Sequence, residues 1–237
     1  MSMLDGRVAI VTGAAGNLGR ATAAALRAAG AKTVLVDASK EHLQQAYPGT
    51  QDPDCLLHGG IDLTDEQGAH SIATAAVDRF GRIDVLVNTV GGFRGGKAVH
   101  EEELATWDLM MAINVRTTLL ACRAVLPEFH ARGSGAIVNI AAGAALSSPA
   151  GLAAYSASKS AVIRLTEALA AEGKARGIRV NAVLPGTIDT PQNRAAMPNA
   201  DTSKWVAPEA IADVIVFLAS DAARAITGVA LPVFGRA

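Results

Sequence analysis

The sequence predicts an α/β fold in which helices cover both faces of a mostly parallel β-sheet. Half of the 237 residues are hydrophobic and only 4% are aromatic, so the core must consist mainly of Ala, Val, Leu and Ile side chains. Short apolar runs alternate with longer helical patterns from end to end, as in sheets whose parallel strands are joined by crossover helices. No linker, repeat or low-complexity segment interrupts this alternation, so we expect residues 1–237 to form a single domain.

The apolar runs and helical patterns define the expected elements in order. The expected strands are Val8–Val11, Thr33–Val36, Cys55–Gly59, Val85–Val87, Ala136–Ile140, Arg179–Val183 and Val229–Val233. The expected helices are Leu18–Ala29, Asp65–Phe80, Glu102–Arg132, Ala154–Arg176 and Pro208–Ala219. Two other segments, Gly91–Gly96 and Pro191–Lys204, are rich in turn-forming residues, and we expect them to be mobile lids.

Composition and charge exclude several classes of function. The formal net charge is −1, which leaves no broad basic surface for nucleic acid. The longest apolar run, Val214–Ala219, is far shorter than the roughly 20 residues that span a bilayer, so no membrane partner is expected. Cys55 and Cys122 match no redox or metal spacing, and the five histidines show no ligand pattern. We therefore expect a cytoplasmic protein with free thiols and without a metal site.

A glycine-rich turn, Thr12–Gly19, follows the first expected strand and precedes an alanine-rich helix. Glycines at such a turn let the backbone approach a pyrophosphate closely, and the start of the helix presents free N–H groups to the negative charge. The position between strand and helix therefore predicts a dinucleotide-binding site. Its candidate residues are Gly13, Gly16, Asn17, Leu18 and Gly19.

Asp37 stands directly after the second expected strand. A carboxylate at this place can accept hydrogen bonds from both ribose hydroxyls of an adenosine, and it would repel a 2′-phosphate. No basic residue occupies Ala38 or Gly16, where one could meet that phosphate, although Lys40 is near in sequence. NAD(H) is therefore favoured over NADP(H), which stays an alternative. A purely structural role, in which Asp37 caps the next helix, also stays open.

Tyr155 and Lys159 are four residues apart, so they share one face of the expected helix Ala154–Arg176. A nearby ammonium group lowers the pKa of a phenol from its ordinary value of about 10, which would let Tyr155 exchange a proton near neutral pH. The same ammonium group can hold the nicotinamide ribose. The pair predicts proton transfer coupled to hydride transfer.

Together these motifs resemble, in order and spacing, the short-chain dehydrogenase/reductase family over essentially the whole chain. The matching segments are Thr12–Gly19, Asn88–Gly91, Asn114, Tyr155 with Lys159, Pro185–Gly186 and Ile226–Gly228. The resemblance implies a Rossmann-type, doubly wound sheet of seven strands and an enzyme that moves a hydride between a nicotinamide cofactor and a small-molecule substrate. It also implies catalysis by Tyr155 and Lys159, with Asn114 supporting a proton relay.

The resemblance extends to further cofactor contacts and to assembly. Asp62 corresponds to the residue that touches the adenine, with Leu63 beside it, and Ile188 and Thr190 to residues near the carboxamide. The other implied cofactor-lining residues are Asn88, Gly91, Pro185 and Gly186. The family also implies a homodimer or homotetramer that packs through Glu102–Arg132 and Ala154–Arg176.

The sequence departs from the family pattern at three places. Asn17 replaces the middle glycine of the turn, and we expect it to be tolerated because asparagine enters left-handed backbone more easily than most residues. Thr89-Val90 replaces the common Asn-Ala. Ala142 replaces the serine that hydrogen-bonds the substrate oxygen, 13 residues before Tyr155. Three interpretations follow from Ala142: a substrate that does not need this donor, a slow enzyme, or a cofactor-binding relic.

The first interpretation is supported by a more specific resemblance, to the dihydropteridine reductases, which also have alanine there. It rests on Gly91–Phe93, Ala141–Leu146 and Leu184–Arg194, together with Met197-Pro198, Ala200-Asp201 and Trp205. The implied substrate is a quinonoid dihydropterin or similar conjugated heterocycle, on which Phe93 would stack beside Ala142 and Tyr155. The alternatives are a general carbonyl reductase or alcohol dehydrogenase, acting on 3-oxoacyl thioesters, sugars or quinones, and a non-enzymatic NAD(H)-binding sensor.

Overall fold

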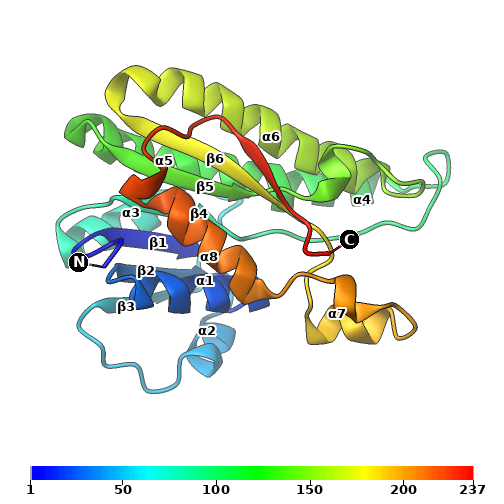
Figure 1. Cartoon of the computed structure of the whole chain (residues 1–237), viewed down its shortest axis with the longest axis horizontal. Coiled ribbons are helices and arrows are strands. Elements are labelled where there is room, and N and C mark those ends of the chain that lie inside the picture. Colours follow the sequence, from blue (N-terminus) through cyan, green and yellow to red (C-terminus); the bar gives the residue numbers. More distant parts are fainter. Residues whose placement is uncertain (1, 237) are drawn as a thin grey trace.

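The computed structural model describes residues 2–236 and contains one sheet of seven strands, in the order β3-β2-β1-β4-β5-β6-β7. All six neighbouring pairs are parallel. The expected α/β, Rossmann-type fold is therefore confirmed (Figure 1). The strands are β1 (Val8–Thr12), β2 (Lys32–Asp37), β3 (Cys55–Gly59), β4 (Val85–Asn88), β5 (Gly135–Ile140), β6 (Ile178–Pro185) and β7 (Ala230–Val233).

Helices cover both faces of this sheet. They are α1 (Asn17–Ala28), α2 (Lys40–Ala46), α3 (Glu66–Phe80), α4 (Leu104–Met110), α5 (Thr117–Arg132), α6 (Ala153–Gly173), α7 (Pro191–Ala196) and α8 (Pro208–Ala219). Helices α1 and α8 pack together on one face, whereas α3, α5 and α6 share a core with the other face. Helix α7 lies apart from both layers, below the carboxyl ends of the strands in Figure 1.

Burial on both faces explains why the strands read as continuous apolar runs. In β1, Val11 points to the core beneath α1 and α8, while Ile10 points to the core beneath α3, α5 and α6. Val87 and Leu86 of β4 divide in the same way. Alternate side chains thus enter two separate apolar layers. Because both faces are buried, the strands show no alternation of polar and apolar residues.

The structure differs from the sequence prediction in two short helices and one long one. Helices α2 and α7 were not expected, because they span only seven and six residues and begin at the polar caps Ser39 and Thr190, which read as turns. The long helix expected at Glu102–Arg132 is interrupted by a π-helical segment, Met111–Arg116. Taken as one helix, residues 104–132 are long and apolar enough to cross a membrane by length and composition alone, a test that buried core helices also pass.

The sheet topology determines where a site can form. The chain leaves β1 and β4 in opposite lateral directions, so a crevice opens between the carboxyl ends of these adjacent strands. Thr12, at the end of β1, lies opposite Asn88, at the end of β4. The glycine turn and the loop after β4 both begin at this edge.

Candidate active site

The glycine turn has the geometry of a close backbone approach. Gly13 has a φ of +64°, and a Cβ there would lie 3.0 Å from the Val90 backbone nitrogen. A Cβ at Gly19 would collide with the Gly13 carbonyl oxygen. The N–H groups of Asn17 and Leu18, in the first turn of α1, have no acceptor within the helix, so they are free to bind an anion.

The structure corrects the explanation offered for Asn17. Gly16 is the extended N-cap of α1 and Asn17 is the first helical residue. Among the described residues, only glycines have positive φ. Asn17 is therefore accommodated because its position is helical, and no left-handed backbone is required. Its side-chain Nδ2 instead donates a 2.8 Å hydrogen bond to Oε1 of Gln192 in α7.

Two side chains brace the turn from behind. Asp37 accepts a hydrogen bond from the Ala15 N–H at 3.0 Å and another from the Ser39 N–H at 3.1 Å. The Tyr47 hydroxyl donates to the Ala14 carbonyl at 3.0 Å. Tyr47 could not be found from the sequence, because a tyrosine well beyond the end of a strand has no evident partner until the chain folds.

A polar hollow of about 460 Å³ opens beside the Asp37 carboxylate. It is lined by Ala15, Gly16, Arg20, Asp37, His42, Gln45 and Ala46. The sequence suggested no basic group next to Asp37, but the structure places Arg20 and His42 around the same hollow. The Arg20 guanidinium beside this hollow would attract a 2′-phosphate and so offset part of the repulsion from Asp37.

The predicted adenine contacts lie at the end of β3. Asp62 is exposed, and its Oδ1 accepts hydrogen bonds from the Thr64 hydroxyl at 2.7 Å and the Thr64 N–H at 2.8 Å. These two bonds lower the pKa of Asp62. Leu63 is buried. Asn88 is also buried, and its Nδ2 donates to Asn139 Oδ1 at 2.9 Å, so its side chain joins β4 to β5 inside the sheet.

Asn114 connects three elements at the end of the sheet. It lies in the π-helical segment, where its Oδ1 accepts from the Gly92 N–H at 2.9 Å. Its Nδ2 donates to the Gly92 carbonyl at 3.1 Å and to Ser158 Oγ at 3.0 Å. Ser158 in turn donates to the Tyr155 carbonyl at 2.7 Å. Asn114 thus fixes the loop after β4 against the first turns of α6.

Lys159 is 5% exposed, and its Nζ donates to the Ile140 carbonyl at the end of β5, at 3.0 Å. Burial lowers the pKa of this amine to about 8. A Cβ at Gly91 would lie 3.0 Å from both Lys159 Nζ and Asn114 Oδ1. The structure therefore brings Gly91, Asn114 and Lys159 together.

The pKa of Tyr155 differs from the sequence expectation. Burial raises the pKa of this phenol, and no effect of Lys159 offsets the rise. The expected lowering fails because the ammonium group is directed at the Ile140 carbonyl and is itself poorly solvated. Phe93 packs edge-on against the Tyr155 ring, with centroids 5.0 Å apart, while half of its own surface stays exposed.

Ala142 ends the β5 side of the site. It has extended backbone, and its side chain is nearly buried at 8% exposure. The following residue, Gly143, faces the ring of Phe234, which a Cβ at position 143 would approach to 3.1 Å. Pro185 ends β6, and the Gly186 N–H donates to the Val233 carbonyl at 3.1 Å. The C-terminal segment therefore packs behind this wall of the site.

The two segments expected to be mobile lids are tied down at defined points. Gly92 is held by Asn114, and the Gly96 N–H donates to the Gly151 carbonyl at 2.8 Å. In the second segment, Thr190 accepts from the Asn193 N–H at 3.1 Å and so caps α7. Ile188 forms a parallel bridge with Val206. The first of these loops is therefore anchored at both ends rather than free.

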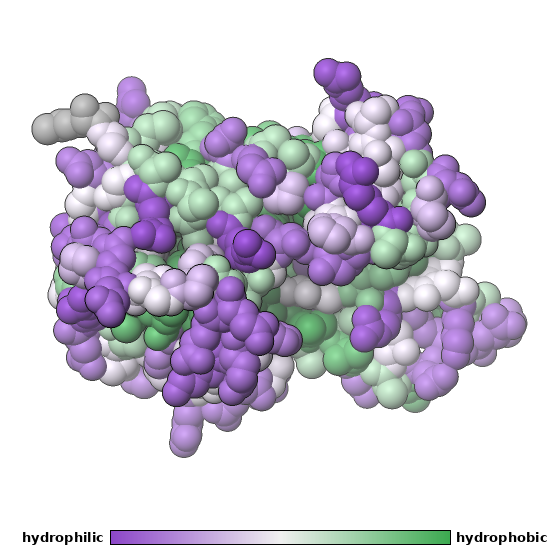
Figure 2. All heavy atoms as spheres, turned by 90° about the horizontal axis from the view of Figure 1, so that it is seen from below, coloured by the Kyte–Doolittle hydropathy of each residue, from purple (hydrophilic) through white to green (hydrophobic). Residues whose placement is uncertain are grey.

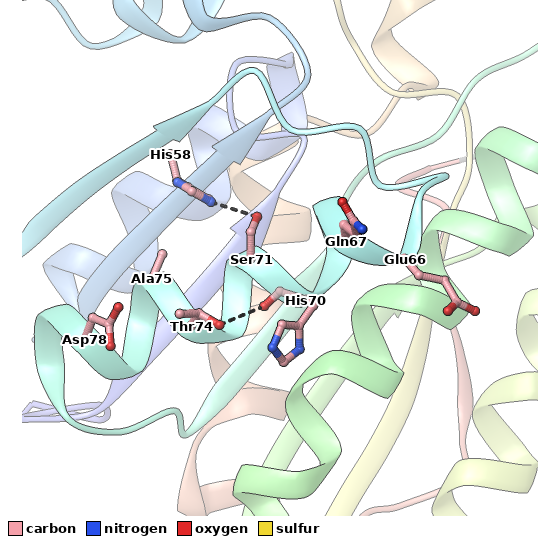
Figure 3. Close-up of a pocket in the computed structure, with 8 residues that line it drawn as sticks. All are labelled: His58, Glu66, Gln67, His70, Ser71, Thr74, Ala75 and Asp78. Carbon is pink, nitrogen blue, oxygen red and sulfur yellow. Dashed lines mark hydrogen bonds between the residues drawn. The ribbon is translucent and has the colours of Figure 1, made fainter.

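A separate hollow of about 550 Å³ lies between β3 and α3 (Figure 3). It is lined by His58, Glu66, Gln67, His70, Ser71, Thr74, Ala75 and Asp78, none of which is a predicted site residue. His58 is only partly buried, and its Nε2 is 3.0 Å from Ser71 Oγ. In residues 2–236 no group of three or more His, Cys, Asp and Glu side chains is arranged to hold a metal ion.

Comparison with known proteins identifies the family. The short chain dehydrogenase family model matches residues 7–201. The chain is a member of the short-chain dehydrogenase/reductase family. Its fold is shared by family relatives of known structure, including NAD⁺-bound xylitol dehydrogenase, with a TM-score of 0.88, 29% identity and coverage of 98% of this chain and 99% of the other.

Two relatives align with this chain over nearly their full length. A 2-(R)-hydroxypropyl-CoM dehydrogenase from Xanthobacter autotrophicus is 36% identical, covering 97% of this chain and 97% of the relative. A D-threitol dehydrogenase from Mycolicibacterium smegmatis is 39% identical, covering 98% of this chain and 93% of the relative. Both names describe the oxidation of a hydroxy compound.

Burial of the Lys159 amine should make the free energy of unfolding of this protein depend on pH. Its folded-state pKa of about 8 lies below the ordinary 10.5, so burial of the cation destabilises the fold fully below pH 8. The penalty then disappears as the pH rises toward 10.5. We expect Lys159→Met to raise the free energy of unfolding at pH 7 by on the order of 2 kcal/mol, after loss of the bond to Ile140.

Urea unfolding between pH 6 and 10.5 measures this effect. The stability of the wild type should approach that of Lys159→Met as the pH rises from 8 to 10.5. Lys174→Met, at an exposed position on the 3₁₀ turn after α6, is the control and should show no such convergence. Parallel curves for wild type and Lys159→Met would contradict a buried, destabilising cation.

Proposed function

We propose that this protein is an NAD(H)-dependent oxidoreductase that interconverts a small-molecule secondary alcohol and the corresponding ketone. The observation that carries the proposal is the meeting of Tyr155, Lys159 and Asn114 at the same sheet edge as the glycine turn. The relatives named above act on hydroxy compounds, which agrees with this substrate class.

The residues present fit a nicotinamide dinucleotide. Gly13 and Gly19 let the turn fold tightly, because a Cβ at either position would meet backbone atoms, and the first turn of α1 offers N–H groups to a pyrophosphate. Asp37 is held rigidly by two backbone N–H groups and would accept the ribose hydroxyls, which favours NAD(H). Lys159 would bind the nicotinamide ribose. The bound cofactor supplies or accepts the hydride.

The chain itself supplies the proton. In the reductive direction, the neutral Tyr155 phenol donates its proton to the substrate oxygen, and its raised pKa keeps it in the protonated form that this step needs. Asn114 and Ser158 hold α6 so that the phenol keeps one position. In the oxidative direction the Tyr155 oxygen must accept the proton of the substrate hydroxyl, a step that rising pH favours because it populates the phenolate.

A second substrate class, the quinonoid dihydropterins and similar conjugated heterocycles, is favoured by one local feature. Ala142 offers no hydroxyl to a developing alkoxide, and Phe93 presents an exposed ring beside Tyr155. A flat conjugated imine would use the ring and would not need the missing donor. The relatives' names do not include this class, so we rank it second.

Steady-state assays with four substrate types distinguish these proposals. We expect oxidation of secondary alcohols and polyols with NAD⁺ and reduction of ketones with NADH, with NADPH giving at least tenfold lower kcat/KM because of Asp37. An acetoacetyl thioester and a quinonoid dihydropterin complete the panel. Turnover of the pterin alone would reverse our ranking, and equal use of NADPH would show that Arg20 and His42 outweigh Asp37.

Assembly and location complete the proposal. The helix from α4 to α5 exposes Leu104, Trp107, Leu109 and Leu119, which together favour packing against another copy of the chain. We therefore expect a homodimer or homotetramer. Cys55 and Cys122 are free and buried, and burial raises the pKa of the Cys122 thiol to about 12. Two unpaired, unreactive thiols agree with a reducing cytoplasm.

A further inference from the structure

Helix α7 is a flap with almost no apolar attachment to the rest of the protein. None of its six residues is buried, and no other helix or strand packs closely along it. The base of the flap is clamped where the Val206 N–H donates to the Thr187 carbonyl at 3.0 Å and the Asp189 N–H donates to the Val206 carbonyl at 2.8 Å. Polar contacts must therefore determine where the tip of the flap lies.

Most polar contacts of the flap are internal. Thr190 caps the helix, and the Asn193 amide donates to the Ile188 carbonyl at 2.8 Å. Arg194 forms a bidentate ion pair with Asp189, at 2.6 and 2.7 Å. These bonds make α7 a preformed unit, but they do not attach it to the dinucleotide-binding half of the protein.

One side-chain hydrogen bond joins the flap to that half. Asn17 Nδ2 donates to Gln192 Oε1 at 2.8 Å, across 175 positions of sequence. Asn17 belongs to the phosphate-binding turn and occupies the place where the family pattern has glycine, which carries no amide. A hollow of about 570 Å³ lies beside the bond, lined by residues of α1, α7 and α8 that include Arg20, Pro191 and Glu209.

The surface on this side of the molecule offers α7 little apolar contact. Figure 2 views the molecule from the side of α2 and α7 and shows a mostly hydrophilic face, with hydrophobic side chains visible in the recess between its left and right halves. Because none of the six residues of α7 is buried, separating the helix from α1 exposes little apolar surface. Opening is therefore opposed mainly by the hydrogen bond.

We propose that the Asn17–Gln192 hydrogen bond is a latch that holds α7 over the phosphate-binding turn and slows the release of bound NAD(H). This inference rests on the proposed dinucleotide function. A pyrophosphate held by the N–H groups of the first turn of α1 would be next to Asn17, the first residue of that helix, and the bond to Gln192 would then hold α7 close to it. Both residues act by positioning the flap, and neither is a catalytic residue.

The test is a double-mutant cycle on the dissociation rate of NADH, followed by stopped-flow fluorescence. Asn17→Gly restores the family residue, and Gln192→Ala removes the acceptor without touching the turn. A net hydrogen bond of roughly 0.5–1.5 kcal/mol corresponds to a rate increase of about two- to thirteenfold for each single variant. The double variant should be no faster than the faster single variant. The matched control is Asn199→Ala, which removes an exposed amide in the segment that follows α7. This variant should release NADH as slowly as the wild type.

The proposal is overturned if Gln192→Ala releases NADH at the wild-type rate, or if the effects of the two single variants multiply in the double variant. Hydrogen exchange of residues 187–206 gives a second readout that does not depend on cofactor chemistry. Gln192→Ala should speed exchange in α7, and unchanged exchange would also overturn the latch. If no variant and no wild-type sample binds NADH, the proposed function fails, while the exchange data still decide whether the latch exists.

Discussion

Tyr155→Phe is expected to lower kcat by about 10²- to 10⁴-fold, because it removes the phenol that the proposed mechanism uses as the proton donor, in the turn of α6 that Ser158 and Asn114 hold. The ring remains, so its edge-on packing against Phe93 at 5.0 Å is preserved. The dissociation constant of NADH, measured by fluorescence titration, should change less than threefold. A loss confined to kcat would assign proton transfer to the phenolic hydroxyl.

The other tyrosine provides a matched control. Tyr47→Phe also removes one hydroxyl, but this hydroxyl donates to the Ala14 carbonyl behind the glycine turn. We expect it to weaken NADH binding by a few-fold and to leave kcat at saturating cofactor unchanged. Turnover that survives Tyr155→Phe across the whole substrate panel would eliminate Tyr155 as the proton donor. Wild-type protein that binds NADH but turns over no substrate of the panel would favour a dinucleotide sensor.

Ala142→Ser is expected to raise kcat/KM for simple ketones by about 10²-fold, because one added donor to a developing oxyanion is typically worth 10²–10³ in rate. The backbone at position 142 is extended and accepts any residue, and the position lies two residues after the end of β5. For a quinonoid dihydropterin the same change should have little effect or should lower the rate, since that substrate develops no alkoxide.

Ala141→Ser is the control for this prediction. Ala141 is 3% exposed and packs in the small apolar core with Val162 and Leu184, so its hydroxyl would be directed away from substrate. We expect destabilisation without a gain in rate. Ketone kinetics that do not improve in Ala142→Ser would mean that a second donor is not what limits this enzyme, and the dihydropterin interpretation would gain support.

The sheet and its major helices were predictable because each strand is a continuous apolar run buried on both faces. The strands from β1 to β7 begin and end within about two residues of their expected limits. Gly13 and Gly19 were predictable for a related reason, since the backbone there leaves no room for a side chain. Burial on both faces and the absence of space for a side chain can therefore be predicted from short stretches of sequence.

Features that depend on contacts between distant segments were not predictable. Nothing near Asn17 in the sequence points to Gln192, and nothing near Asp37 points to Arg20. The pKa of Tyr155 was expected to fall because Lys159 is four residues away. It rises, because the direction of the ammonium group and the burial of the phenol are properties of the assembled site.

The π-helical segment Met111–Arg116 links the chemistry of the site to the packing of the core. A π-turn contains one residue more than the α-turn it replaces. It therefore rotates the side chains of α5, which follow it, relative to those of α4, which precede it. Deleting one residue there would preserve a helix but would turn either Asn114 away from Gly92 or Phe129 away from the sheet. The contacts of Asn114 and of Phe129 therefore both oppose insertions and deletions in this stretch. The number of residues between positions 104 and 132 should be conserved more strictly than the residue types.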